Sequence, residues 1–405
     1  MLVKNTRNRI FLTLCITGIF AILSSTMSKN PVLKPFSTHL ETPEGFWTGF
    51  VASVSTIPGI LVSLPAASLS DILGRRRVLL ISAAIFASAP FLYLIISAWW
   101  HLVLVRFYHG FATAIFVPVA EASVAELFPS RRGERLSLFS SATAVGRATA
   151  PFLGGYILFI SDFGYNMLYL SVGIAGVTAF MTALLFLTER QCSEALPSGS
   201  ENTLRGLMFT WRNIAGNREI LGASFIQASQ FFVFGAVEFF LVGYLKDVVQ
   251  LDAFQIGIVM GSQIVAIILA KPFMGRLSDN VGRKVPIITG SLLGGLPLLL
   301  ISFSTQVSVL FILSIAYGLG FAMVTSSTPA LVSELAPITL AGTAMGFLSM
   351  TMDIGQTIGP LFTGMIIATN LGYPGAFTAL TVVLWLSTLM FISFRVMKEV
   401  FMPTK

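Results

Sequence analysis

Long apolar stretches of about 20 residues alternate with short polar clusters along almost the whole chain. A helix of that length can cross the hydrocarbon core of a bilayer. Because backbone groups in lipid must find partners within their own segment, each stretch is predicted to be a transmembrane helix. The twelve predicted spans cover residues 9–30, 46–69, 77–97, 101–125, 137–160, 165–188, 219–245, 253–275, 285–304, 307–332, 341–368 and 371–395.

The composition agrees with this pattern, since 55% of the 405 residues are hydrophobic and only 11% are charged. A soluble globular domain carries about 25% charged residues, so a water-soluble class of protein is excluded. The formal net charge of +7 could indicate nucleic-acid binding, but the basic residues fall in short clusters between the spans. That placement is typical of topology signals, so we expect a lipid bilayer and no nucleic acid as partner.

The basic clusters also predict an orientation. Twelve spans place both termini on one side, and six clusters of Lys and Arg fall on that same side. By the positive-inside rule, both termini are predicted to be cytoplasmic, in a multi-pass protein of the plasma membrane. The clusters are Lys4/Arg7/Arg9, Arg75–Arg77, Arg131/Arg132/Arg135, Arg190/Arg205/Arg212/Arg218, Arg276/Arg283/Lys284 and Arg395/Lys398/Lys405.

Few residues can support metal, disulfide or catalytic chemistry. Cys15 lies in the first span and Cys192 in a polar stretch, so no disulfide is expected. The three histidines, His39, His101 and His109, are scattered and form no predicted metal site. The sequence has no GxxxxGK[ST] phosphate loop and no nucleophile–base pattern. We therefore expect neither an enzyme nor a bound cofactor.

Sliding the sequence along itself reveals an internal repeat. A shift of 208 positions superposes several glycines and charges, and a shift of 209 continues the match farther along. We interpret residues 1–188 and 219–405 as two six-helix halves in parallel repeat, joined by a cytoplasmic linker at 189–218. An interfacial helix around Trp211 is the alternative interpretation of that linker. The matched pairs are Asp71/Asp279, Gly74/Gly282, Arg75/Arg283, Arg76/Lys284, Gly110/Gly318, Glu126/Glu334, Pro129/Pro337, Gly146/Gly355, Pro151/Pro360 and Gly155/Gly364.

A charged loop motif follows the second span of each half. Residues 275–284 are GRLSDNVGRK, and the first copy, AASLSDILGRRR, has Ala67 and Ile72 where the pattern has glycine and arginine. This motif resembles the loop motif of the major facilitator superfamily. A tight glycine turn would bring arginines near acidic helix ends, and we expect these clusters to lock the cytoplasmic face until the halves rock apart. Capping of helix ends is the alternative role. The gate candidates are Asp71, Gly74, Arg75, Arg76, Glu126, Asp279, Gly282, Arg283, Lys284 and Glu334.

A second motif lies in the predicted fourth span, where residues 106–110 are RFYHG. It resembles the family pattern R-x-x-Q-G, with His109 in place of glutamine. An unpaired charge inside a membrane costs at least about 2.5–3.5 kcal/mol, so Arg106 needs partners. Helical spacing places Arg106, His109 and Thr113 on one stripe, which predicts a cavity or coupling role. Snorkelling of Arg106 to the interface, and a single hydrogen bond for His109, are the alternatives.

A third motif is GRATAPFLGG at residues 146–155. It resembles the fifth-span antiporter motif G-x-x-x-G-P-x-x-G-G, with Ala150 in place of one glycine, and the second half has GQTIGPLFTG at 355–364. Small residues at this spacing let helix backbones approach closely, and a proline within a span bends the helix. The candidate residues are Gly146, Pro151, Gly154, Gly155, Gly355, Gly359 and Pro360.

The three motifs follow one another as they do in the drug/proton antiporter branch of the superfamily. The resemblance implies an all-α membrane protein with twelve transmembrane helices in two parallel-repeat six-helix bundles. It also implies secondary transport by alternating access, in which the halves rock against each other.

Ionisable residues inside the spans are candidates for coupling transport to protons, because a charge in lipid is costly to keep. Asp353 and Glu238 are the predicted proton carriers, with Arg106 and Arg147 as cationic neighbours. Neutralisation of a basic neighbour is the alternative role of Asp353, and Glu238 is also predicted to contact Lys29. The coupling candidates are Asp353, Glu238, Arg106, Arg147, His109 and Glu121.

Aromatic and polar residues share one stripe of the span at 219–245, as expected of a wall that binds lipophilic compounds. We expect a monomer that exports small lipophilic or cationic compounds, with the small-molecule substrate and protons as its partners. Transport of a sugar or of an organic anion clamped by Arg106 and Arg147 is the alternative, followed by a lipid flippase or a non-transporting sensor. The cavity candidates are Thr113, Gln227, Phe231, Phe234, Tyr317 and Phe321.

Overall fold

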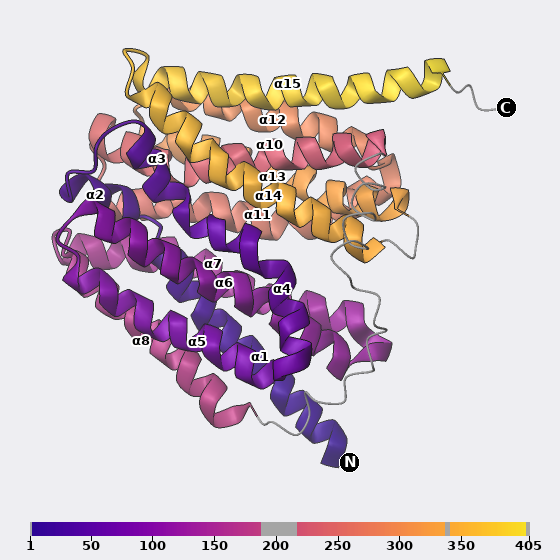
Figure 1. Ribbon diagram of the computed structural model, residues 1–405. Coiled ribbons are helices and arrows are strands. Elements are labelled where there is room, and N and C mark those ends of the chain that lie inside the picture. Colours follow the sequence, from indigo (N-terminus) through magenta and orange to yellow (C-terminus); the bar gives the residue numbers. More distant parts are fainter. Residues whose placement is uncertain (1, 188–216, 337–340, 402–405) are drawn as a thin grey trace. The chain divides into compact units, whose positions relative to one another are not determined.

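The structure is a computed structural model that describes residues 2–187, 217–336 and 341–401 (Figure 1). Within those ranges the chain is built from helices and has no strand, which confirms the predicted all-α class. The predicted linker at 189–218 lies almost entirely outside the described residues, and so does the alternative helix around Trp211. The helices of the first half are α1 (Leu2–Met27), α2 (Leu33–His39), α3 (Phe46–Ser53), η1 (Val54–Thr56), α4 (Ile57–Leu73), α5 (Arg75–Leu92), η2 (Tyr93–Ile95), α6 (Trp99–Leu127), η3 (Pro129–Arg131), α7 (Arg132–Ile160) and α8 (Tyr165–Phe186). Those of the second half are α10 (Arg218–Gly243), η5 (Tyr244–Val248), α11 (Ala253–Val281), α12 (Lys284–Ile301), α13 (Val307–Leu335), α14 (Ala341–Ile367) and α15 (Gly372–Phe401).

Eleven helical segments of the described chain are long and apolar enough to cross a membrane. They match eleven of the twelve predicted spans to within a few residues at most ends. The remaining prediction, 341–368, coincides with α14, which has 27 residues but is less apolar. Asp353 and Gln356 lie in the middle of that helix and lower its hydropathy, which fits a helix that presents polar groups to other helices.

The second predicted span, 46–69, is not the single helix that the sequence indicated. The structure interrupts it with the 3-10 turn η1 between α3 and α4. Pro58 stands at the start of α4 and has no backbone N–H, so regular helical bonding cannot continue across this position. The interruption changes which carbonyl oxygens are available to neighbouring side chains.

The described chain divides into two compact units. Unit 1 holds Met1–Pro43, Phe50–Pro197 and Leu245–Gly261, and unit 2 holds Glu44–Gly49, Ser198–Tyr244 and Ser262–Lys405. Each unit therefore contains most of one repeat and a short segment of the other. The two units differ from the two halves and linker predicted from the sequence, because each unit includes a short segment of the other repeat.

Glycines set the closest helix contacts, and the same contact recurs in both repeats. A Cβ built on Gly146 of α7 would collide with the carbonyl oxygen of Ile19 in α1. In unit 2, a Cβ on Gly355 of α14 would collide with the carbonyl oxygen of Ala228 in α10. Each partner is also 209 positions from its counterpart, so the internal repeat of the sequence is a repeat of backbone contacts.

A second pair of glycine contacts holds the short segment that each unit takes from the other repeat. These borrowed segments are Leu245–Gly261 in unit 1 and Glu44–Gly49 in unit 2. In unit 1, a Cβ on Gly155 of α7 would lie 2.9 Å from the Cα of Gly257 in α11. In unit 2, a Cβ on Gly364 of α14 would lie 3.1 Å from the backbone nitrogen of Gly49 in α3. Only glycine permits such an approach, and it holds each borrowed segment against its unit.

Each unit also has its own buried apolar core. In unit 1, Phe86 and Phe116 are fully buried between α5 and α6. In unit 2, Ile287, Val332 and Leu348 join α12, α13 and α14 in the same way. These cores fix the helices that carry the charged and polar residues described below.

Replacing Gly355 with alanine is expected to destabilise the protein, because the added methyl group collides with a helix backbone that cannot move away cheaply. The expected loss is about 1–3 kcal/mol, as for other overpacked sites. The measurement is the thermal unfolding midpoint of the purified protein in detergent.

The matched control is Gly275→Ala in α11, where no atom lies within 4 Å of the added Cβ. Alanine is the better helix former, so this variant should be as stable as the parent or slightly more stable. Equal midpoints for the two variants would contradict the close contact between α10 and α14.

Candidate functional site

The loop motif of the first half forms a compact ionic cluster in unit 1. Gly74, with a φ of +92°, makes the turn between α4 and α5 in a conformation that favours glycine. The next residue, Arg75, turns back and donates from Nη2 to one carboxylate oxygen of Glu126 and from Nε to the other. Arg75 also donates to the hydroxyl of Ser70. Its side chain is only 7% exposed, so these bonds satisfy an almost buried guanidinium.

The second half repeats this cluster in unit 2. Gly282 makes the turn with a φ of +85°, and Arg283 donates to a carboxylate oxygen of Glu334 at 2.8 Å. Arg283 also donates to the Ser278 hydroxyl at 2.8 Å and pairs with Asp279. The hydrogen bond with Glu334, followed by that with Asp279, raises the pKa of Arg283 above its usual value against the opposing effect of partial burial. The positive charge of Arg283 is therefore permanent.

Three other gate candidates take different places. Arg76 donates to the carbonyl oxygens of Leu187 at 2.6 Å and Leu184 at 3.5 Å, so it caps the end of α8 and stays apart from Glu126. The side chain of Asp71 lies outside the described part of the structure. Lys284 begins α12 and lines a pocket in unit 2.

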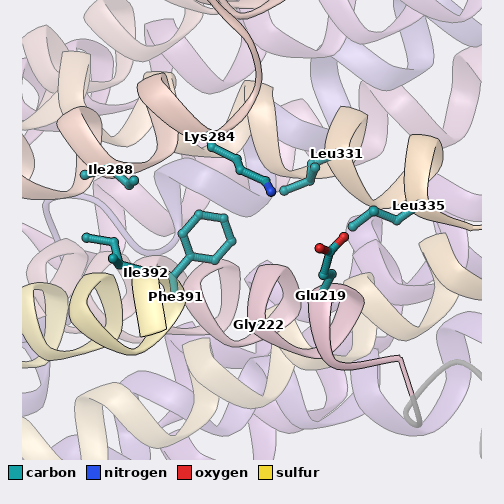
Figure 2. Close-up of a pocket in the computed structure, with 8 residues that line it drawn as sticks. All are labelled: Glu219, Gly222, Lys284, Ile288, Leu331, Leu335, Phe391 and Ile392. Atoms are coloured by element: carbon teal, nitrogen blue, oxygen red, sulfur yellow. The ribbon is translucent and has the colours of Figure 1, made fainter. Parts of the chain in front are cut away.

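The pocket lined by Lys284 is a hollow of about 470 Å³ that includes space open to the outside. Figure 2 shows the side chains of Lys284, Glu219 and Phe391 extending into it from three different helices. The pocket therefore places one group of each charge at the end of unit 2 where the loop motif lies. Its lining consists of Glu219, Gly222, Lys284, Ile288, Leu331, Leu335, Phe391 and Ile392.

Arg106 lies on α6 and is 1% exposed. Its Nε donates to the carbonyl oxygen of Val51 at 2.7 Å, and its Nη2 donates to that of Ala52 at 3.2 Å and to the Ser55 hydroxyl at 2.8 Å. All three acceptors belong to α3 or η1, beside the interruption of the second span. The guanidinium therefore joins α6 to this irregular backbone, while Glu121, farther along α6, is exposed.

His109, one turn beyond Arg106, lies in an aromatic cluster. Its Nδ1 lies 3.4 Å from the hydroxyl of Tyr93, and its ring contacts Phe86 edge to face. Tyr93 in turn stacks on Tyr169 with ring centroids 4.3 Å apart. Nε2 of His109 is buried and has no hydrogen-bond partner among the described residues. No pattern in the sequence indicated Tyr93 and Tyr169, which come from separate helices.

Thr113, the third residue on the predicted stripe, bonds to the hydroxyl of Ser25 in α1 at 3.1 Å. The three residues of the stripe on α6 therefore contact different parts of unit 1. Arg106 contacts α3 and η1, His109 contacts the aromatic cluster, and Thr113 contacts α1. The Ser25 contact shows that Thr113 lies at a packed helix interface.

Four of the predicted cavity residues do meet in unit 2. Phe234 of α10 stacks on Phe321 of α13 with ring centroids 4.7 Å apart, and Phe231 contacts the same ring edge to face at 5.4 Å. Tyr317, one turn before Phe321, lies 6.4 Å from it. Gln227 is buried one turn before Phe231 on α10, where its amide contacts the sulfur of Met352 at 3.6 Å. Together α10 and α13 form a continuous aromatic surface inside unit 2, in which Phe231 is half-buried and Phe234, Tyr317 and Phe321 are buried.

The remaining coupling candidates lie on separate helices. Glu238 of α10 is half-buried and interacts electrostatically with Tyr317. Asp353 of α14 is also half-buried, and Arg147 of α7 is exposed. Lys29 belongs to unit 1 and Glu238 to unit 2, so their contact stays a prediction. Among the described residues, no group of three or more His, Cys, Asp or Glu side chains could hold a metal ion.

The residues of the third motif pack helices together. Besides Gly146, Gly155, Gly355 and Gly364, the set includes Gly154, whose added Cβ would lie 3.0 Å from Pro31. A Cβ on Gly359 would collide with the carbonyl oxygen of Phe232 in α10, and one on Gly49 would collide with that of Pro360. Pro151 lies inside α7, and its carbonyl oxygen would lie 2.6 Å from a Cβ on Gly257.

The two ionic clusters are expected to respond differently to the loss of their acidic partner. Glu126→Gln leaves the almost buried Arg75 with a neutral acceptor and should cost about 1.5–3 kcal/mol of unfolding free energy. Glu334→Gln should cost less, because Arg283 is 20% exposed and keeps its pairing with Asp279. Chemical unfolding in detergent measures both, and an equal or reversed order would contradict this account.

Comparison with known proteins places these features in a family. Residues 10–252 and 223–403 each match the Major Facilitator Superfamily. The multi-drug resistance efflux pump PmrA of Streptococcus pneumoniae is 25% identical over 364 residues, which cover 88% of both chains. Among solved structures, a bacterial homolog to the human lysosomal transporter Spinster, inward-facing and unoccupied, has a TM-score of 0.80 at 16% identity, covering 98% of this chain and 99% of its own. The nucleoside transporter NupG has a TM-score of 0.77 at 16% identity and covers 95% of this chain and 99% of its own.

The two solved structures share the fold, and the family match extends over nearly the whole chain. This multi-pass membrane protein, with its two repeated six-helix halves, is a transporter of the Major Facilitator Superfamily.

Proposed function

We propose that this transporter exports small lipophilic cations in exchange for protons by alternating access. The observation that carries the proposal is the aromatic surface of Phe231, Phe234 and Phe321, which adjoins Tyr317 and the carboxylate of Glu238. The name of the relative PmrA, a multi-drug resistance efflux pump, supports export of drug-like compounds.

An aromatic surface next to a carboxylate suits a lipophilic cation for two reasons. The faces of aromatic rings carry partial negative charge and attract cations by about 0.5–2 kcal/mol per contact. The rings also bury the apolar body of the compound without requiring specific hydrogen bonds. Glu238 supplies the full negative charge that a cation needs when it leaves water.

A carboxylate beside the aromatic surface can also couple export of the cation to the movement of protons in the opposite direction. A proton and a cation compete for the same oxygen atoms, so binding of one favours release of the other. Alternating access would then carry them in opposite directions. Glu238 is the candidate next to the aromatic surface, and Asp353 of α14 is the second candidate.

We further propose that the clusters of Arg75 with Glu126 and of Arg283 with Glu334 lie on the cytoplasmic side. The positive-inside rule supports this placement, together with cytoplasmic termini in a plasma-membrane protein. Each cluster holds its helix ends in a fixed geometry, and a contact between the clusters and the opposite half would close the inner side.

Transport of an organic anion receives less support. The anion clamp required Arg106 and Arg147, but Arg106 already donates to Val51, Ala52 and Ser55 within its own unit. Releasing those bonds would leave backbone carbonyl oxygens without partners in a buried region. The arginine therefore acts as a helix connector.

Proton release from inverted membrane vesicles with an acidic interior tests the proposed exchange. Adding lipophilic cations should release protons from vesicles that contain the parent protein, and Glu238→Gln should lower the rate at least about tenfold, because the neutral amide can hold neither ion. Asp353→Asn shows in the same assay whether the second carboxylate is needed.

Asp162→Asn is the control, since Asp162 is exposed and its positive φ of 47° also suits asparagine. Proton release only with sugars or organic acids would refute the substrate class. Full activity of both Glu238→Gln and Asp353→Asn would refute the coupling residues.

A further inference from the structure

The place of Arg106 in unit 1 has a counterpart in unit 2 that holds no arginine. The 208-residue repeat puts Ser314 at the position of Arg106, Gln263 at that of Ser55 and Tyr317 at that of His109. These residues lie on α13 and α11 in the same way that the first set lies on α6 and η1.

The packing around both places is the same. In unit 1, a Cβ on Gly110 would collide with the carbonyl oxygen of Ser55. In unit 2, a Cβ on Gly318 would lie 2.7 Å from the carbonyl oxygen of Gln263. The helices therefore meet in equivalent register, so the two sets of side chains occupy equivalent positions.

The guanidinium of Arg106 fills this position in unit 1, where it donates to carbonyl oxygens at the end of α3 and to the Ser55 hydroxyl of η1. Pro58 accompanies that interruption, and its counterpart in unit 2 is Ala266. Without the proline, α11 continues as one helix through this region, and its carbonyl oxygens stay in helical hydrogen bonds. Unit 2 thus lacks both the arginine and the irregular backbone that receives it.

Four polar atoms at this position of unit 2 are buried without a hydrogen-bond partner among the described residues. They are Oε1 and Nε2 of Gln263, Oγ of Ser314 and the hydroxyl oxygen of Tyr317, and each residue is 1% exposed. Leaving one such atom unsatisfied costs about 1–3 kcal/mol, so a cluster of them calls for a partner.

We propose that Gln263, Ser314 and Tyr317 form the seat for a hydrogen-bond-donating organic cation, the guanidinium or primary ammonium group of the transported compound. The oxygens of the three side chains accept its N–H groups, as backbone and Ser55 oxygens accept those of Arg106. The proposal deepens the proposed function and rests on it for the class of ligand.

The surroundings of the seat suit the rest of such a compound. Glu238 interacts electrostatically with Tyr317 and supplies negative charge. Phe321 lies one turn beyond Tyr317 and stacks with Phe234, so an apolar body attached to the cation meets the aromatic surface. Quaternary ammonium compounds carry the same charge but have no N–H group, which makes them a direct test of the hydrogen bonds.

Binding of two matched probes to the purified full-length protein in detergent provides the test. 2-Phenylethylguanidinium and 2-phenylethyltrimethylammonium share their apolar body and their charge, and only the first donates hydrogen bonds. Titration calorimetry should show at least about tenfold tighter binding of the guanidinium probe.

Ser314→Arg should place the chain's own guanidinium in the seat and remove that preference, with binding of the guanidinium probe at least about tenfold weaker. Ser314→Ala is the milder variant and should weaken the guanidinium probe alone, by about threefold to tenfold. Ser393→Arg, the same substitution at an exposed position of α15, is the control and should bind both probes as the parent does.

Equal affinity of the parent for the two probes would overturn the seat and leave export of lipophilic cations standing. A preference for the guanidinium probe that persists in both Ser314 variants would also overturn it. Binding of neither probe would overturn the seat, and proton release with cations in vesicles would then decide the proposed function separately.

Discussion

Close contact between helix backbones at glycines is the interaction on which the rest of this structure depends. Lipid tails are as apolar as the helix surfaces, so the hydrophobic effect does not drive helices together in a membrane. Their association depends on short-range packing instead. Gly146 against Ile19 and Gly355 against Ala228 provide that packing at equivalent places in the two repeats. The aromatic surface on α10 and the polar seat between α11 and α13 have their positions because these contacts fix the surrounding helices.

The two repeats share a backbone plan but satisfy their buried polar groups differently. At the loop motif they agree, because Arg75 and Arg283 each bond to a serine and a glutamate at matching positions. At the equivalent positions of Arg106 and Ser314, the two repeats differ. Unit 1 fills this position with the guanidinium of Arg106, although Nε2 of His109 stays without a partner among the described residues. In unit 2 the side-chain oxygens of Gln263, Ser314 and Tyr317 have no such donor. A symmetric fold thereby acquires one binding half and one supporting half.

Much of this could be predicted from the sequence, because it depends on patterns that a single chain displays. Apolar length predicted the spans. The glycine turn of the loop motif, with Glu126 and Glu334 at nearby helix ends, predicted the pairing of these residues with Arg75 and Arg283. Helical spacing also predicted that Phe231 and Phe234 share a face. The acceptors of Arg106 escaped prediction, because they depend on a local break in α3 whose effect on neighbouring carbonyl oxygens requires coordinates. The bond from Arg76 to Leu187 also escaped, since it joins residues far apart in sequence and carries no motif.

The borrowed segments have a consequence for how the protein is made. Glu44–Gly49 belongs to unit 2, yet it is synthesised before most of unit 1. It must therefore wait for Gly364 of α14, which packs against Gly49 and follows it by 315 residues. At about 5–20 residues per second, that wait lasts on the order of tens of seconds. During that interval the start of α3 sits in the membrane without its final neighbour. Biogenesis therefore cannot proceed as two successive and independent insertions, because α14 completes the packing of α3, which is synthesised long before it.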